Sequence, residues 1–158
     1  MTAQTLTIST PEQMHAFGIA VAHHLRAGDV VALNGELGAG KTTFTRGLGE
    51  GLGIRGSVTS PTFVLARTHP RTAGGTPLVH VDAYRLTSPA ELDDLDIDFD
   101  ASIVVIEWAA GMVEEVAVAW LQIDIRRPVG GVESAEGVEP REIVVTGHGS
   151  RWDTLRLV

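Results

Sequence analysis

Gly35-Glu36-Leu37-Gly38-Ala39-Gly40-Lys41-Thr42 is the stretch that decides how this chain folds. Its spacing, G-x-x-x-x-G-K-T, is that of a phosphate-binding loop, in which glycines let the backbone curl until successive N–H groups point at phosphate oxygens. The lysine ammonium then reaches the outer phosphates, and the threonine hydroxyl can ligate a bridging Mg²⁺. The helix that follows such a loop adds its positive N-terminal end.

The residues on both sides of this loop fit the motif. Residues 30–33 read Val-Val-Ala-Leu, a short apolar run of the buried-strand type. Residues 42–52 predict a helix, because Phe44, Leu48 and Leu52 are spaced four apart on one face, and Gly53 stands where a helix C-cap is expected. A strand before the loop and a helix after it are the context that a phosphate loop needs.

Composition limits the classes of protein that the chain can belong to. Its 158 residues and 44% apolar content suit a single domain, residues 1–158, with one core. A net charge of −8 disfavours an extended nucleic-acid footprint, which needs clustered Lys and Arg. Lys41 is the single lysine of the chain, which favours a function for it.

The sequence also limits where the protein works. The absence of cysteine excludes disulfides and thiolate metal sites. The first residues lack the basic region and apolar core of a secretory signal. The most apolar stretch, residues 103–123, holds three glutamates, which argues against a membrane span. We therefore expect a cytoplasmic protein without membrane association.

The order of predicted elements indicates an α/β fold. A helix start is predicted at Thr10, where a capping hydroxyl precedes Pro11 and Gln13 follows three residues on. Further short helices are expected from residue 89 to about 95 and at 111–117, and loops at 70–77 and 127–141. Strands are expected at residues 6–8, 30–33, 63–66, 78–81, 103–106, 120–125, 142–146 and 154–157. This order predicts a P-loop NTPase-type sheet with parallel core strands, antiparallel edge strands and helices on the faces.

Two of the apolar runs end in a carboxylate. Residues 78–81 lead to Asp82, and residues 103–106 lead to Glu107. Ligands of open α/β sheets bind beyond the C-terminal ends of the strands, and a phosphate loop needs acids there for Mg²⁺ and for the attacking water. Either residue can be this acid, and a solvated carboxylate at a strand end is the structural alternative for each.

Four further features have both a functional and a structural interpretation. Ser60-Pro61-Thr62 fits a γ-phosphate-sensing switch or a simple turn before a strand. Trp108 suits base stacking or packing. His80 shares a strand face with Asp82, and we interpret it as a structural histidine. The acidic run from Glu91 to Asp100 is typical of a solvated loop, with docking to a basic partner as the alternative.

Together these motifs resemble the TsaE family of small bacterial ATPases required for threonylcarbamoyladenosine modification of tRNA. They span about half of the chain, and four motifs in this order are far more specific than the phosphate loop alone. The motifs that carry the resemblance are Gly35 to Thr43, Ser60-Pro61-Thr62-Phe63, His80-Val81-Asp82-Ala83-Tyr84-Arg85-Leu86 and Ile106-Glu107-Trp108.

The resemblance implies a function and a set of site residues. Family members bind ATP and Mg²⁺, hydrolyse ATP slowly by themselves, and act with TsaB and TsaD, so that tRNA is reached indirectly. It implies catalytic roles for Lys41, Asp82 and Glu107, with Thr42 and Glu107 on the magnesium side and Asp82 near the γ-phosphate and water. The nucleotide-binding residues that it implies are Glu36, Leu37, Gly38, Ala39, Gly40, Lys41, Thr42, Thr43, Thr62 and Trp108.

Two other functions are compatible with a phosphate loop. A small metabolite kinase of this fold usually carries an arginine-rich lid, but Arg67, Arg71 and Arg85 are scattered here. A non-catalytic nucleotide switch has no need of strand-end acids such as Asp82 and Glu107. The sequence therefore favours an ATPase that serves as an accessory subunit of a tRNA-modifying complex.

Overall fold

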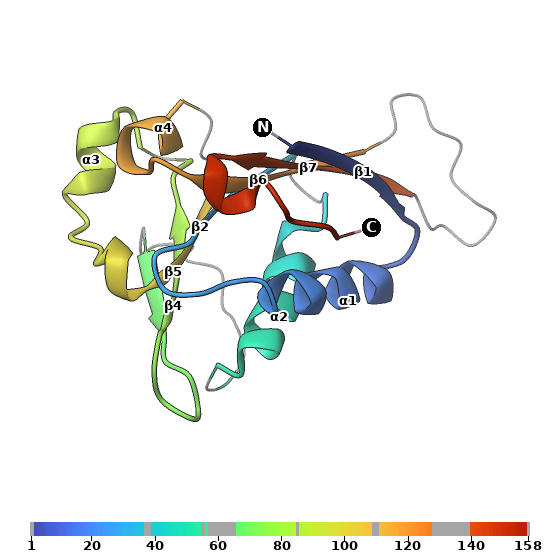
Figure 1. The fold of residues 1–158 in the computed structure, drawn as a ribbon, viewed down its shortest axis with the longest axis horizontal. Coiled ribbons are helices and arrows are strands. Elements are labelled where there is room, and N and C mark those ends of the chain that lie inside the picture. The colour runs from blue at the N-terminus through green and yellow to red at the C-terminus, as the bar shows by residue number, and fades with distance from the viewer. Residues whose placement is uncertain are drawn as a thin grey trace.

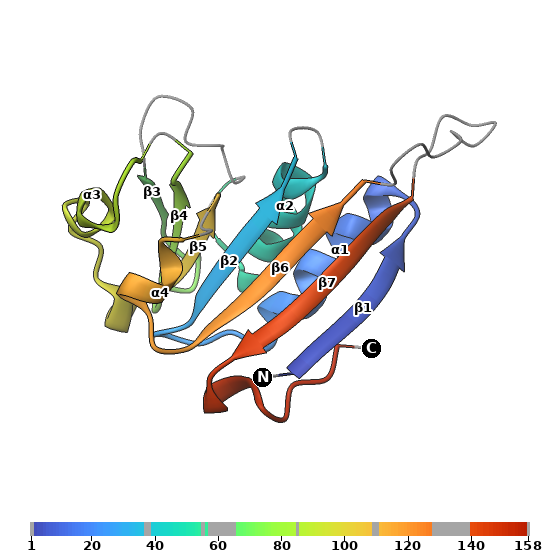
Figure 2. The ribbon, with the colours of Figure 1, turned by 90° about the horizontal axis from the view of Figure 1, so that it is seen from above.

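A mixed β-sheet organises the chain in the computed structural model, which describes residues 2–36, 39–54, 56, 66–84, 86–108, 111–127 and 140–157. Within these residues seven strands form one sheet in the order β1-β7-β6-β2-β5-β4-β3 (Figures 1 and 2). The strands are β1 (Thr2–Ile8), β2 (Val30–Gly35), β3 (Ala66–His69), β4 (Leu78–Asp82), β5 (Ile103–Glu107), β6 (Trp120–Arg126) and β7 (Arg141–His148).

The strand directions divide the sheet into a centre and two edges. Strand β2 pairs in parallel with β5 and β6, and β4 pairs in parallel with β5. The pairs β3–β4, β6–β7 and β1–β7 are antiparallel. The predicted parallel core with antiparallel edge strands is thus confirmed.

Helices cover both faces of the sheet. The helices α1 (Pro11–Ala22) and α2 (Lys41–Leu52) lie side by side on one face, and the short helices α3 (Pro89–Asp93) and α4 (Val113–Val116) lie on the other (Figure 2). Alternate residues of β2 divide between the two cores: Val31 and Leu33 pack toward α1 and α2, and Val30 and Ala32 pack toward α3 and α4. Strand β2 is therefore buried from both sides, as its apolar run predicts.

Glycines set the close approach of α1 and α2. A Cβ atom at Gly47 would lie 2.1 Å from the backbone oxygen of His15, and one at Gly18 would lie 2.3 Å from the oxygen of Phe44. No side chain fits at these separations, so the backbones of the two helices touch. Phe17 and Phe44 add a tilted ring pair, 5.5 Å between centroids, on the core side. The helix that begins at Lys41 is thereby held against α1 along its length.

Most of the predicted elements are present, and their local chemistry is as expected. The Thr10 hydroxyl accepts a hydrogen bond from the Gln13 backbone N–H at 3.1 Å, and Pro11 is the first residue of α1. Gly53 ends α2 in the left-handed conformation, with φ of 69°. Helix α3 is shorter than expected and ends at Asp93. Of the predicted strand at residues 63–66, only Ala66 lies among the described residues, where it begins β3.

The predicted strand at residues 154–157 is wrong. A short 3₁₀-helix, η2 (Ser150–Trp152), follows β7, and residues 154–157 then form no ladder with a neighbouring strand. The side chain of Gln4 takes the place of strand pairing, since its Nε2 donates to the Leu155 carbonyl at 2.9 Å and its Oε1 accepts from the Leu157 N–H at 2.8 Å. A second 3₁₀-helix, η1 (Phe99–Ala101), precedes β5.

Among the described residues, no helix has the length and apolar character that crossing a bilayer requires.

Candidate functional site

Three parallel strands end side by side and bring the two acids next to the phosphate loop. Strand β2 ends at Gly35, β4 at Asp82 and β5 at Glu107, and Glu107 is in register with both Asp82 and Leu33. The hydrogen bonding continues one residue further, because the Trp108 N–H donates to the Leu33 carbonyl at 3.2 Å. Both carboxylates therefore lie at the carboxyl edge of the sheet, where the loop between β2 and α2 begins.

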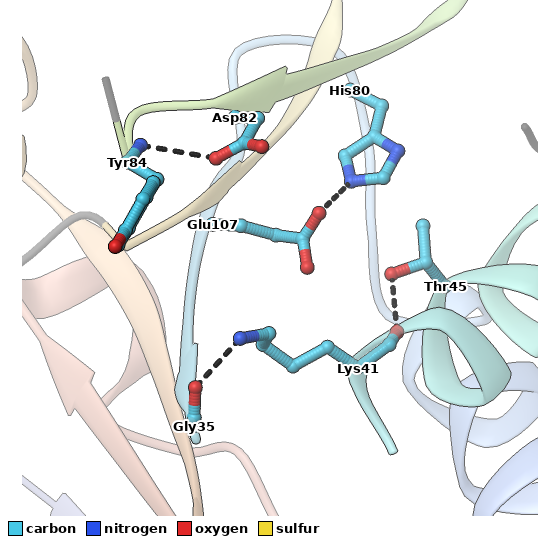
Figure 3. Close-up of polar contacts among 7 residues, drawn as sticks. All are labelled: Gly35, Lys41, Thr45, His80, Asp82, Tyr84 and Glu107. Atoms are coloured by element: carbon cyan, nitrogen blue, oxygen red, sulfur yellow. Dashed lines mark hydrogen bonds and ion pairs between the residues drawn. The ribbon is translucent and has the colours of Figure 1, made fainter. Parts of the chain in front are cut away.

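Lys41 holds its ammonium group inside this corner. The residue is 8% exposed, and Nζ donates to the Gly35 carbonyl at 2.6 Å (Figure 3). Nζ also lies 3.8 Å from the ring centre of Trp108, a cation–π contact. Burial lowers the pKa of Lys41, and the negative charges of Glu107 and then Asp82 partly oppose that shift. The lysine is thus placed between the loop and the two acids.

The start of α2 is shaped by one glycine. Gly40 has φ of +114°, a conformation that residues with a side chain rarely adopt, and it directs the chain from the loop into the helix. Met14 of α1 packs against it, since a Cβ atom there would lie 3.2 Å from the Met14 Cε. Thr45 Oγ1 donates to the Lys41 carbonyl at 2.7 Å within the first turn. Arg141, at the start of β7, donates from Nε to the Ala39 carbonyl at 3.1 Å.

Glu107 is buried and held by a histidine. His80 Nε2 lies 2.7 Å from Glu107 Oε2, and the two residues are 1% and 6% exposed. Glu107 lies between Asp82 and Lys41 in Figure 3, and its second carboxylate oxygen is directed away from His80. Asp82 is less buried, and its Oδ1 accepts a hydrogen bond from the Tyr84 backbone N–H at 3.0 Å. Each acid therefore has one oxygen within hydrogen-bonding distance of a neighbouring nitrogen.

Trp108 forms one wall of a pocket beside the site. Its φ of 60° is left-handed, and its ring lies 5.2 Å from that of Tyr84, centroid to centroid. The pocket has a volume of about 570 Å³. Part of its lining is polar, where Asp124 accepts hydrogen bonds from Asn34 at 3.1 Å and from Gln122 at 2.9 Å. The lining residues are Asn34, Gly35, Ala83, Tyr84, Leu86, Trp108, Met112, Gln122 and Asp124.

The donor set at the strand ends suits Mg²⁺ brought in with a phosphate. In the described part of the chain, no group of three or more His, Asp and Glu side chains could hold a metal ion, the acidic run from Glu91 to Asp100 included. Magnesium rarely uses an all-protein cage and is usually bound through one or two carboxylates together with substrate phosphates and water. Asp82, Glu107 and Thr42 carry oxygen donors of the kind that such binding would use.

Comparison with known proteins then assigns the family. The family model described as "Threonylcarbamoyl adenosine biosynthesis protein TsaE" matches residues 8–131. The chain belongs to the TsaE family. The match contains all the site residues that the sequence predicts, from Glu36 to Trp108, and most of the sheet that positions them.

Individual relatives extend the similarity to nearly the whole chain. A protein of Streptomyces coelicolor named "tRNA threonylcarbamoyladenosine biosynthesis protein TsaE" is 56% identical over 144 residues, which cover 89% of this chain and 95% of that one. A Bacillus subtilis protein of the same name is 39% identical over 92% of this chain and 86% of its own length. The crystal structure of Bacillus subtilis YdiB has a TM-score of 0.73 at 33% identity and covers 96% of this chain and 90% of that chain.

Most of the predicted site residues of this TsaE family member can be placed. Lys41, Asp82, Glu107 and Trp108 come together at the ends of β2, β4 and β5. Thr42 and Thr43 lie in the first turn of α2, where Thr42 is exposed and Thr43 half-buried. Glu36 is exposed, Ala39 is buried and Gly40 is half-buried. The predicted nucleotide-binding residues Leu37, Gly38 and Thr62 lie outside the described residues, as do Arg85 and most of the loop at 127–141.

Two contacts at this site were not predicted from the sequence. The ring of His80 contacts Glu107, which is compatible with the structural role expected for this histidine, but the sequence did not predict its partner. The only signal in the sequence was its spacing of two residues from Asp82, which puts both side chains on one face of β4. Arg141 contacts the phosphate loop from 102 residues away, and nothing in the local sequence indicates that contact.

Proposed function

We propose that this protein is a Mg²⁺-dependent ATPase and an accessory subunit of the complex that forms threonylcarbamoyladenosine in tRNA. It acts in the cytoplasm through partner proteins of the TsaB and TsaD type and does not transfer the threonylcarbamoyl group itself. Its membership of the TsaE family supports the pathway, and the names of its relatives carry the same description. The observation that carries the ATPase is the meeting of Lys41 with Asp82 and Glu107 at three strand ends.

Lys41 and the start of α2 are the groups proposed to hold the phosphates. The ammonium of Lys41 moves from the Gly35 carbonyl to the outer phosphate oxygens, which offer it stronger charged acceptors. The left-handed Gly40 turns the backbone so that the first N–H groups of α2 face an anion. Nucleotide binding is therefore expected to depend on the positive charge at position 41 and on a glycine, which has no side chain, at position 40.

The two acids and Thr42 are proposed to organise the reaction centre. Thr42 and Glu107 would hold Mg²⁺, which when bound neutralises charge on the β- and γ-phosphates. Asp82 is proposed to orient water near the γ-phosphate; its register beside Glu107 and the hydrogen bond that one of its oxygens accepts from the Tyr84 N–H support this role. Trp108 lies over the Lys41 ammonium and is proposed to contact the nucleotide once that ammonium engages the phosphates.

The surface of the chain fits an indirect relation to tRNA. With 20 acidic and 12 basic residues, the protein lacks the excess positive charge that an extended tRNA footprint needs. Contact with tRNA through partner proteins avoids electrostatic repulsion between this negatively charged protein and the tRNA phosphates. An accessory ATPase of this kind couples hydrolysis to the state of its partners.

Reconstitution of tRNA modification tests this proposal. TsaB- and TsaD-type proteins from the same source, a threonylcarbamoyl donor and unmodified tRNA are combined with ATP and Mg²⁺, and modified adenosine is measured by mass spectrometry of nucleosides. Repeated turnover that requires the wild-type protein, and fails with Lys41→Ala, is expected. Equal yields with and without this protein would contradict the accessory role, whereas equal yields with wild type and Lys41→Ala would contradict the ATPase.

A further inference from the structure

The contact between His80 and Glu107 has no part in the phosphate-loop motif. Both residues are buried, at 1% and 6% exposure, on neighbouring parallel strands. His80 Nε2 and Glu107 Oε2 are 2.7 Å apart, within the range of a strong hydrogen bond to a carboxylate. A buried carboxylate is costly unless donors satisfy it, so the histidine stabilises the acid in this position.

The surroundings of the imidazole decide which of its nitrogens carries the proton. Nδ1 of His80 is buried and has no hydrogen-bond partner among the described residues. A buried N–H group without an acceptor is far less favourable than a bare ring nitrogen, because an N–H donor loses its bond to water. The proton of the neutral ring is therefore assigned to Nε2, which makes His80 the donor and Glu107 the acceptor.

The hydrogen bond from His80 constrains only one of the two carboxylate oxygens of Glu107. Oε2 is engaged by His80, while the second carboxylate oxygen is directed toward the side of the site where Lys41 lies (Figure 3). A histidine on one oxygen thus fixes the rotamer of the acid and leaves the other oxygen facing the phosphate loop. Partners of this kind, hydrogen-bonded to a metal-ligating side chain, orient the ligand and affect metal affinity.

We propose that His80 is a positioning residue that holds Glu107 in the orientation needed to bind the magnesium of a metal–nucleotide complex. This inference rests on the proposed function of Glu107. It assigns to a buried histidine of β4 a role in metal affinity, exerted through hydrogen bonding and not through contact with the nucleotide.

Two amide substitutions separate this role from a general need for the histidine. In His80→Gln the amide nitrogen replaces Nε2 at about the same reach, so the donor to Glu107 is kept. In His80→Asn the amide is one carbon shorter and reaches only the position of Nδ1, so the donor is lost. His80→Leu removes all polar atoms at a similar volume. His69→Asn and His69→Leu are matched controls, because His69 is a second buried histidine on the neighbouring strand β3.

Metal affinity is measured without turnover. Mn²⁺ is titrated into protein saturated with a non-hydrolysable ATP analogue, and bound and free Mn²⁺ are distinguished by electron paramagnetic resonance. We expect wild type, His80→Gln and both His69 variants to agree within about threefold, and His80→Asn and His80→Leu to bind Mn²⁺ about 10 to 100 times more weakly. In turnover assays the same two variants require more Mg²⁺ for half-maximal rate, while the KM for the metal–ATP complex at saturating Mg²⁺ changes little.

A double variant tests whether His80 acts through Glu107. If it does, adding His80→Asn to Glu107→Gln lowers Mn²⁺ affinity no further than Glu107→Gln alone. An additive loss, wild-type Mn²⁺ affinity in a folded His80→Asn or His80→Leu, or a folded His80→Gln as weak as His80→Leu would each overturn the positioning role. If neither the Asn nor the Leu variant folds, His80→Gln decides alone: weakened Mn²⁺ binding in the folded Gln variant overturns the positioning role, and wild-type binding supports it.

The failure of this inference differs from the failure of the proposed function. If wild type shows no metal–nucleotide binding that depends on Lys41, the ATPase assignment fails, and with it the role of His80. If wild type binds the metal complex and Glu107→Gln weakens it while the His80 variants do not, only the positioning role is overturned.

Discussion

A single methyl group added at Gly47 should push the packed helices α1 and α2 apart. In Gly47→Ala the new Cβ would lie 2.1 Å from the His15 carbonyl oxygen, whereas ordinary contact begins near 3.4 Å. The atom in the way is backbone, so helix α1 as a whole must move by about 1 Å, because no rotamer change can relieve the overlap. Such a shift weakens the contacts along the helix pair, including the packing of Phe17 on Phe44.

Two opposing terms give the size of this effect. Alanine is favoured over glycine in a helix interior by about 1 kcal/mol. Overpacking of a well-packed core costs about 1–3 kcal/mol, and a clash with backbone belongs at the upper end. The net loss is therefore about 2 kcal/mol, which lowers the melting temperature of a domain of this size by about 4–8 °C.

Thermal and urea unfolding, followed by circular dichroism without nucleotide, measure this loss. Arg46→Ala is the matched control, because Arg46 is the exposed neighbour of Gly47 on α2 and its change should stay within about 0.5 kcal/mol. A Gly47→Ala protein that melts at or above the wild-type temperature would refute the reasoning, because helix propensity would then outweigh the steric conflict.

Three other predictions concern the site and its surroundings. Lys41→Met should melt at the wild-type temperature or above it while losing ATP turnover, because burial lowers the pKa of Lys41 and so the charged form is disfavoured in the folded state. Gly40→Ala should cost about 1–3 kcal/mol of stability and weaken ATP binding measured by calorimetry, because φ of +114° is unfavourable for alanine. Burial lowers the pKa of His69 below 6.5, so the unfolded chain binds the proton at a higher pH than the folded chain does. The free energy of unfolding of the wild type therefore falls as the pH drops below 6.5. In His69→Leu this pH dependence of the free energy of unfolding should be weaker.

Each of these predictions has a contradicting result. A marked fall in the melting temperature of Lys41→Met would mean that the contacts of its ammonium outweigh the cost of burial. Wild-type ATP affinity in Gly40→Ala would remove that glycine from the binding site. A pH profile of urea unfolding that is the same in His69→Leu and wild type would mean that another group causes the acid sensitivity.

The sequence predicted those features that depend on local pattern or on strand direction. The four-residue spacing of Phe44, Leu48 and Leu52 predicted a helix with one buried face, and all three side chains are buried. The acids at the ends of two apolar runs were expected at one edge of a parallel sheet. Asp82 and Glu107 are indeed in register there.

Features that depend on contacts between distant segments could not be predicted in this way. Residues 154–157 alternate like a strand, but Gln4, which lies far away in the sequence, binds this segment through its side chain. The pairing of His80 with Glu107 requires β4 and β5 to be neighbours, and one sequence does not give strand order. The contact of Arg141 with Ala39 likewise depends on how the β7 end of the sheet lies against the loop.

The fate of the γ-phosphate tests the central claim most directly. ATP labelled at the γ-position is incubated with Mg²⁺ and either wild type or Lys41→Ala, and all labelled products are separated and counted. We expect labelled inorganic phosphate to form with the wild-type protein and to be lost with Lys41→Ala. Label retained in ATP, or transferred to a metabolite or protein in place of water, would contradict the ATPase and favour a nucleotide switch or a kinase respectively.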